Sequence, residues 1–300
     1  MAGVCLESDV ISVAAVTVGS GARPRLTFAG RATVAADQHS SPVLEDLLRQ
    51  GKLQGRQGHL VLPLNGYQTI QLDVSDVPLE EARQAARWQI GERIDYPPEQ
   101  AVIDLYQVAP FAGERRAPSY AVTAHQQSLR KQVDAVSAAG ARVASIDIPE
   151  FALRNICELF VDDLRGVALL LLLDQSGLLV VVRDGVLYLS RQLPMGMDSL
   201  LAYQPDDPAM TELFDTIVLD IQRSFDFCES NFQLPIVSRL LVAQTRQEIP
   251  ALVNYLDDYL TTDVEPLRLD TVMDLAPDME PLDLHQQLLS IGAALRREES

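Results

Sequence analysis

The residues best able to do chemistry are few and widely spaced. No CxxC pair, zinc-type spacing, GxSxG nucleophile motif or phosphate-binding P-loop motif occurs in the chain. The sequence therefore predicts neither a metal centre nor one of the common nucleophilic hydrolases. We expect the cysteines to be reduced and mostly buried thiols. The cysteines and histidines are Cys5, Cys157, Cys228, His39, His59, His125 and His285.

One polar tetrapeptide interrupts the most apolar part of the chain, GVALLLLLDQSGLLVVVRDGVLYLSR (166–191). The insertion Asp174-Gln175-Ser176-Gly177 could break a membrane anchor, turn a pair of strands, or cradle a phosphate. A spanning helix needs about 20 apolar residues with few charges, and neither apolar run approaches that length. Two runs separated by a four-residue turn, then a third after Asp184-Gly185, predict a β-meander. On these residues alone the tetrapeptide is an ordinary hairpin turn.

Composition limits the classes of partner. The chain has 300 residues, 47% of them hydrophobic, and a formal charge of 24 − 42 = −18. This is material for one large or two medium folded domains. The acidity disfavours nucleic acid and an anionic membrane surface, although it leaves a local apolar peptide groove open. Met1-Ala2-Gly3 shows no basic start of a signal peptide, so we expect a cytoplasmic protein.

Hydrophobic periodicity predicts a two-domain α/β protein, because a meander followed by helix–strand–helix occurs in each half. We expect Trp88 to be a core residue of its helix. The acidic segment 270–283 is expected to be a solvated loop or a docking site for a motor ATPase. Strands are expected at 4–18 (a pair turning at Glu7-Ser8-Asp9), 24–34, 59–64, 67–74, 101–108, 120–124, 141–148, 167–191 (three strands), 237–243 and 263–267. Helices are expected from residue 40 and at 78–94, 126–139, 149–161, 209–231, 248–260 and 282–297.

Three stretches carry a resemblance to a known family. The segment 77–108 has a proline-led helix from Pro78, then Ala86-Arg87-Trp88, Tyr96-Pro97-Pro98 and Val102-Ile103-Asp104. RSFDFCES (223–230) and SIGAALRRE (290–298) are similar to two later signatures of that family. Together they resemble PilM and MshI, actin-like cytoplasmic proteins of type IV and MSHA-type pilus assembly. The short chain and the worn nucleotide motifs favour the MSHA-type subgroup.

The resemblance implies an actin-like (ribonuclease H-like) α/β fold of two domains with an inserted SHS2-like subdomain. Residues 1–160 would form the first domain, with the insert at about 66–147. Residues 161–300 would form the second domain.

The resemblance also assigns three turns to a nucleotide cleft. Asp174-Gln175-Ser176-Gly177 would be the second phosphate turn, with Gln175 where nucleotide binders of the family usually carry glycine. Glu7-Ser8-Asp9 would be the first phosphate turn, without glycine and with two carboxylates. Ala243-Gln244-Thr245 would replace the Gly-Gly pair that meets adenosine. These substitutions predict a pseudo-ATPase with no expected cofactor. The alternative is a cleft that binds ATP and Mg²⁺, with Asp174 coordinating the metal ion through water.

The implied function is a non-catalytic cytoplasmic scaffold. It would lie peripheral to the inner membrane and bind the short tail of a PilN-type single-span partner in a groove beside the insert. Two alternatives stay open: an actin-like ATPase or nucleotide-dependent switch, and a relative of the cytoplasmic part of the type II secretion protein GspL.

Overall fold

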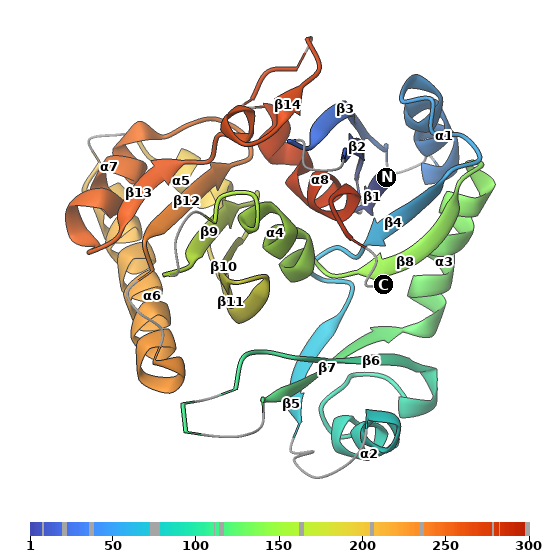
Figure 1. The fold of residues 1–300 in the computed structure, drawn as a ribbon, viewed down its shortest axis with the longest axis horizontal. Helices are drawn as coiled ribbons and strands as arrows, with labels where there is room; N and C mark the ends of the chain where they lie inside the picture. The colour runs from blue at the N-terminus through green and yellow to red at the C-terminus, as the bar shows by residue number, and fades with distance from the viewer. Residues whose placement is uncertain are drawn as a thin grey trace.

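Two large sheets that share one five-strand arrangement form the body of the molecule, and a smaller third sheet projects from it (Figure 1). The computed structural model describes residues 1–7, 9–19, 23–35, 39–72, 79–110, 112–113, 117–161, 165–204, 207–233, 237–277, 279–281 and 283–297; side chains are described from residue 85 onward in the helix that begins at 79.

The first sheet is six-stranded in the order β14-β3-β2-β1-β4-β8. The first three strands in sequence form an antiparallel meander, and β4 and β8 continue it in parallel. Its strands are β1 (Ala2–Leu6), β2 (Val10–Thr17), β3 (Arg25–Thr33), β4 (Gln57–Val61), β8 (Arg142–Asp147) and β14 (Asp274–Leu275).

The second sheet repeats this arrangement in the order β11-β10-β9-β12-β13. It opens with the predicted meander and again continues with two parallel strands. The meander and the similarity of the two halves are thus confirmed. Its strands are β9 (Val167–Leu172), β10 (Gly177–Arg183), β11 (Val186–Leu193), β12 (Arg239–Gln244) and β13 (Asp263–Pro266).

Helices cover both faces of each large sheet. Two of them, α4 (Pro149–Cys157) and α8 (Leu288–Ala294), lie between the sheets and share one apolar core with both (Figure 1). On the outer face of the first sheet lie α1 (Ser40–Gln50) and α3 (Gln126–Ala138). On the outer face of the second sheet lie α5 (Met197–Leu201), α6 (Pro208–Phe232) and α7 (Pro250–Tyr259).

The third sheet is a separate unit with its own small core. Its three strands follow the order β5-β7-β6, and α2 packs on one face. The expected insert of 66–147 is too long, because α3 and β8 pack with the first sheet. The elements of this unit are β5 (Gln68–Leu72), α2 (Leu79–Ile90), a 3₁₀ turn at Pro98–Gln100, β6 (Ala101–Gln107) and β7 (Ser119–His125).

The C-terminal segment returns to the first half, which the division at residue 160 did not anticipate. Strand β14 pairs with β3, and every residue of α8 is buried, against β1, β2, β4 and α4. A helix buried all round needs apolar surface on every side, and the layer between the sheets supplies it. The prediction of a solvated loop at 270–283 is therefore wrong at Met273, which is buried, and at 274–275. Two further 3₁₀ turns occur at Leu269–Thr271 and Asp283–Gln287.

Trp88 is 87% exposed, so the expectation that it packs in a core is wrong. Ala86 and Ile90, four residues apart, are the fully buried residues of the described part of α2. Residues at i and i+4 share a helix face, and position 88 between them points away from the sheet. Within the described residues, no helix is both long and apolar enough to cross a bilayer.

The closest approach of α4 and α8 gives a stability prediction. A Cβ at Gly292 would overlap the backbone carbonyl of Ala152 on α4, and neither helix backbone can yield. Gly292→Ala should lower the free energy of unfolding by about 2–3 kcal/mol, as overpacked cores do. Urea denaturation measures it. Gly91→Ala is the control, because its Cβ would meet the Pro98 ring at 3.3 Å and no backbone atom closer than 3.7 Å. Equal losses in both variants would contradict the prediction.

Candidate functional site

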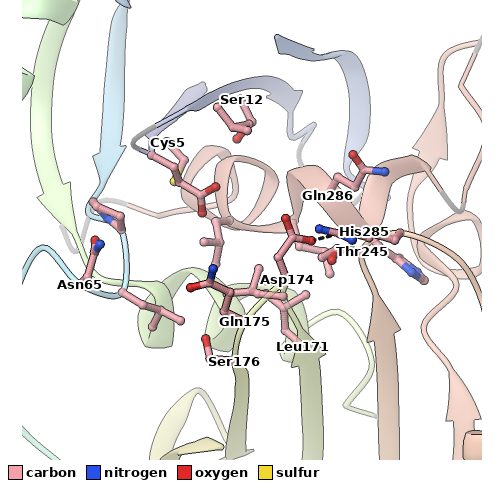
Figure 2. A pocket seen from close by; sticks show the side chains of 18 of the residues that line it. Cys5, Ser12, Asn65, Leu171, Asp174, Gln175, Ser176, Thr245, His285 and Gln286 are labelled. Carbon is pink, nitrogen blue, oxygen red and sulfur yellow. Dashed lines mark hydrogen bonds and ion pairs between the residues drawn. The ribbon is translucent and has the colours of Figure 1, made fainter. Parts of the chain in front are cut away.

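A cleft of about 1130 Å³ opens between the two large sheets. It lies at the matching ends of both meanders, so the β1–β2 turn and the β9–β10 turn line it from opposite halves (Figure 2). The β12–α7 loop and the residues before α8 line it as well. The structure thus brings together the three turns that the resemblance assigned to a nucleotide site.

The first turn presents carboxylates to the cleft. Glu7 and Asp9 line it, and the Glu7 amide closes the turn by donating to the Val10 carbonyl at 2.8 Å. Burial raises the pKa of Glu7; the Arg31 guanidinium opposes this rise, and the charges of Asp9 and Asp174 add to it. Acidic groups from the two halves therefore face one another. Ser8, the middle residue of the predicted turn, lies outside the described residues.

The second turn is a tight hairpin against which the start of α5 packs. The Leu173 amide donates to the Ser176 carbonyl at 2.9 Å. Gln175 and Ser176 line the cleft beside Asp174, whereas Gly177 is the buried first residue of β10. The start of α5 packs on this turn, where the amides of residues 197 and 198 donate to the carbonyls of 173 and 174 at 2.8 Å.

An arginine missed in the sequence analysis offsets part of the negative charge on this side of the cleft. Arg246 lies 2.8 Å from Asp174 Oδ1 through Nε and 2.9 Å from Asp198 Oδ1 through a terminal nitrogen. These contacts raise the pKa of Arg246, the Asp174 hydrogen bond most. The sequence signal was a basic residue directly after Thr245. Its partners are remote in sequence, so only the folded chain identifies them.

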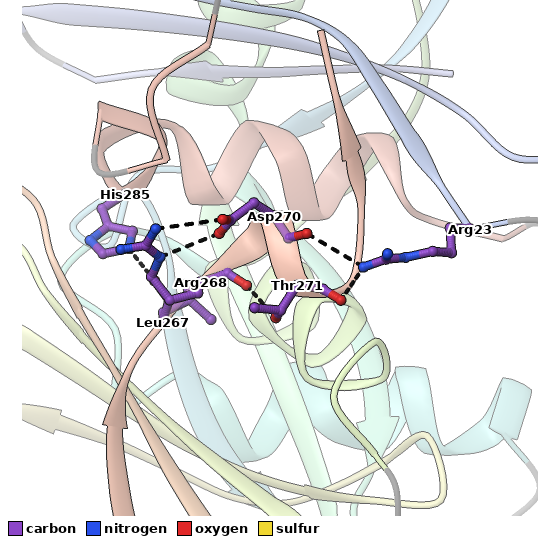
Figure 3. Close-up of polar contacts among 6 residues, drawn as sticks. All are labelled: Arg23, Leu267, Arg268, Asp270, Thr271 and His285. Carbon is purple, nitrogen blue, oxygen red and sulfur yellow. Dashed lines mark hydrogen bonds and ion pairs between the residues drawn. The ribbon is translucent and has the colours of Figure 1, made fainter. Parts of the chain in front are cut away.

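The third turn is filled by its own side chains. Gln244 is 2% exposed, and its side-chain oxygen accepts the Ile249 amide at 2.8 Å at the start of α7. Thr245 Oγ1 donates to the Leu172 carbonyl at 2.9 Å, and Ala243 is fully buried. With its proton on Nε2, His285 donates to the Leu267 carbonyl at 2.9 Å (Figure 3). Its Nδ1 then accepts the Gln244 amide at 3.3 Å.

Two features of the lining bear on whether it could hold a metal–nucleotide complex. Asp174, the carboxylate that would place the metal, is paired with Arg246. In the described part of the chain, no group of three or more His, Cys, Asp or Glu side chains is arranged to hold a metal ion. The thiols Cys5, Cys157 and Cys228 are buried and unpaired, as expected, and burial raises the pKa of each. This leaves the cleft without a reactive nucleophile among them.

A second candidate site is the junction between the third sheet and the N-terminus of α4. Tyr67 donates its hydroxyl to Glu150 Oε2 at 2.6 Å, and Glu150 is only 6% exposed. Tyr106 stacks on Tyr120 with ring centroids 5.3 Å apart and meets the edge of Phe151 at 5.1 Å. The junction combines an aromatic cluster with a buried carboxyl group.

Comparison with solved structures assigns the fold to the actin-like class. A chain of a "PilM-PilN type IV pilus biogenesis complex" superposes with a TM-score of 0.76 at 19% identity, covering 98% of this chain and 97% of that one. A Bacteroides thetaiotaomicron protein with an actin-like ATPase fold and unknown function gives 0.52 at 8% identity, covering 96% and 94%. The ethanolamine utilization protein EutJ of Carboxydothermus hydrogenoformans gives 0.50 at 10% identity, covering 98% and 88%.

These structures confirm the predicted actin-like α/β fold. No protein-family model matches the chain, and no curated protein matches it.

The buried Glu150 gives a pH prediction. Burial, the main cause, raises the pKa of Glu150, and the Tyr67 hydrogen bond opposes the rise. A raised pKa in the folded state means that the fold binds more protons than the unfolded chain, so this group costs stability as pH rises above about 4.3. Glu150→Gln should therefore gain stability over the wild type from pH 5 to pH 8.

Urea denaturation at pH 5, 6.5 and 8 measures that difference. Glu99→Gln, which removes one exposed charge beside β6, is the matched control. A difference that stays constant or shrinks with rising pH would overturn the assignment of a buried carboxyl group.

Proposed function

We propose that this protein is a non-catalytic scaffold of a type IV pilus assembly platform that binds the cytoplasmic tail of a PilN-type inner-membrane protein. The observation that carries the proposal is the likeness to the PilM–PilN complex chain over 98% of this molecule, third sheet included. The other likenesses to solved structures quoted above are much lower. The MSHA-type subgroup and an SHS2-like identity of the third sheet belong to this proposal.

Three features of the cleft support a non-catalytic role. Its first turn and Asp174 bring carboxylates to the region where phosphates would lie, and like charges there repel. Arg246 engages the carboxylate that would place a metal. The third turn is closed by the Gln244 and His285 hydrogen bonds where adenosine would need room.

The junction between the third sheet and α4 supports a peptide site. Strand β6 is an edge of the sheet order β5-β7-β6, so one side of it has no neighbouring strand in the described sheet. An extended peptide can add to such an edge through backbone hydrogen bonds, while side-chain pockets give specificity. Tyr106 and Phe151 lie at this junction and offer aromatic anchors of the kind that dominate binding energy.

The same proposal accounts for localisation. A net charge of −18 disfavours direct adsorption to an anionic leaflet, so a protein partner is the link to the inner membrane that this proposal needs. The PilN-type tail would supply that link. A pilus motor ATPase is the further partner the resemblance suggests.

A peptide titration tests the partner. A fluorescein-labelled peptide of the PilN-type cytoplasmic tail from the same organism should bind with a dissociation constant in the micromolar range. Tyr106→Ala should weaken binding about 10-fold or more, because it removes an aromatic anchor. Tyr259→Ala, an exposed tyrosine on the far side of the second sheet, is the control. No anisotropy change with wild-type protein would refute the proposed partner.

A thermal melt tests the non-catalytic assignment. Millimolar Mg-ATP should leave the melting temperature unchanged. A ligand at about 100 times its dissociation constant would add about 2.7 kcal/mol, a rise of several degrees. Such a rise, together with phosphate release that Asp174→Ala abolishes, would instead establish the ATPase alternative.

A further inference from the structure

Arg246 bridges two carboxylates on one wall of the cleft. Its guanidinium lies between Asp174 on the β9–β10 turn and Asp198 at the start of α5, 2.8 and 2.9 Å from one oxygen of each. These carboxylates come from two separate segments and converge on one cation. The cation that they share is a side chain of the protein itself, the Arg246 guanidinium.

The backbone fixes all three segments around this arginine. The residue before it is anchored twice, because the Thr245 amide and hydroxyl both donate to the Leu172 carbonyl, at 3.2 and 2.9 Å. The Asp198 amide donates to the Asp174 carbonyl at 2.8 Å. A Cβ at Gly196 would overlap the Leu173 carbonyl, so glycine is what lets α5 approach the turn this closely. The backbone segments that carry the two carboxylates and the arginine are thus held next to one another by the fold.

Arg246 and a divalent ion would compete for the same oxygens of Asp174 and Asp198. An arginine stays charged at every physiological pH, and its fork binds carboxylates at fixed geometry. Mg²⁺ requires near-octahedral oxygen ligands and gives up its water reluctantly. To take Asp174 Oδ1 as a ligand, the ion would have to break the Arg246–Asp174 ion pair and then remain beside the displaced positive charge.

We propose that Arg246 is the specificity-determining residue of the cleft: it serves as a built-in cation that satisfies Asp174 and Asp198 and excludes a divalent metal, and with it a metal-bound nucleotide. This inference rests on the proposed non-catalytic function and gives a reason for it. The two carboxylates are present, and the Arg246 side chain prevents them from binding a metal ion. Glu7 and Asp9 on the opposite wall add negative charge that would favour a divalent ion once Arg246 is removed.

Arginine removal tests the proposal directly, with Mn²⁺ as the probe. The electron paramagnetic resonance signal of free aqueous Mn²⁺ falls when the ion binds, so titration gives a dissociation constant without any nucleotide. Arg246→Gln should bind Mn²⁺ at least about 10-fold more tightly than wild type, and the double variant Arg246→Gln/Asp174→Asn should lose that gain. Arg246→Met, which keeps the aliphatic stem, serves if the Gln variant does not fold.

Arg268→Gln is the matched control. It also removes one arginine that pairs with an aspartate, Asp270, but outside the cleft (Figure 3). Its Mn²⁺ affinity should equal that of wild type. Equal binding by wild type and Arg246→Gln would overturn the inference, as would a gain in Arg268→Gln of the same size. Neither result affects the titration with the PilN-type tail peptide. Only a failure of that titration would refute the proposed partner.

Discussion

The packing of α8 against α4 between the two sheets is the constraint on which the rest of the structure depends. Gly292 lets the two helices meet at backbone distance, and Asn155 on α4 donates from Nδ2 to the Gly292 carbonyl at 2.9 Å in the buried layer. A Cβ at Gly3 of β1 would likewise overlap the Ser290 carbonyl. One thin layer therefore serves both halves, and any added volume there separates the sheets and the turns at their ends.

The position of those turns sets the electrostatics of the cleft. Repeating one strand order in two halves brings the β1–β2 and β9–β10 turns face to face, so the acids on one wall meet those on the other. Each wall carries one compensating arginine, Arg31 on the first and Arg246 on the second. The charge of Arg31 opposes the rise in the pKa of Glu7, and Arg246 forms ion pairs with Asp174 and Asp198.

Local pattern was enough to predict most of the fold, because alternation and helical spacing report which face a segment buries. The meander at 166–191 and the long helix α6 are examples. What failed depends on contacts between distant segments. Whether Trp88 is buried depends on which elements pack against its helix. Strand β14 has only two residues, and its partner β3 is remote in sequence. Arg246 meets its partners only in the folded chain. The turns of the site were found through a resemblance, and the charge balance within them was not.

The chain's own contacts outside the cleft join the two halves. Arg23, before β3, donates to the carbonyls of Asp270 and Thr271, just after β13 (Figure 3). Arg296, after α8, pairs with Asp147 Oδ2 at the end of β8 at 2.7 Å, fixing the C-terminal helix to the first sheet. Because these contacts lie outside the lining of the cleft, substitutions within the three turns leave them intact. A frame of this kind keeps its surfaces in place for partners whether or not the cleft binds anything.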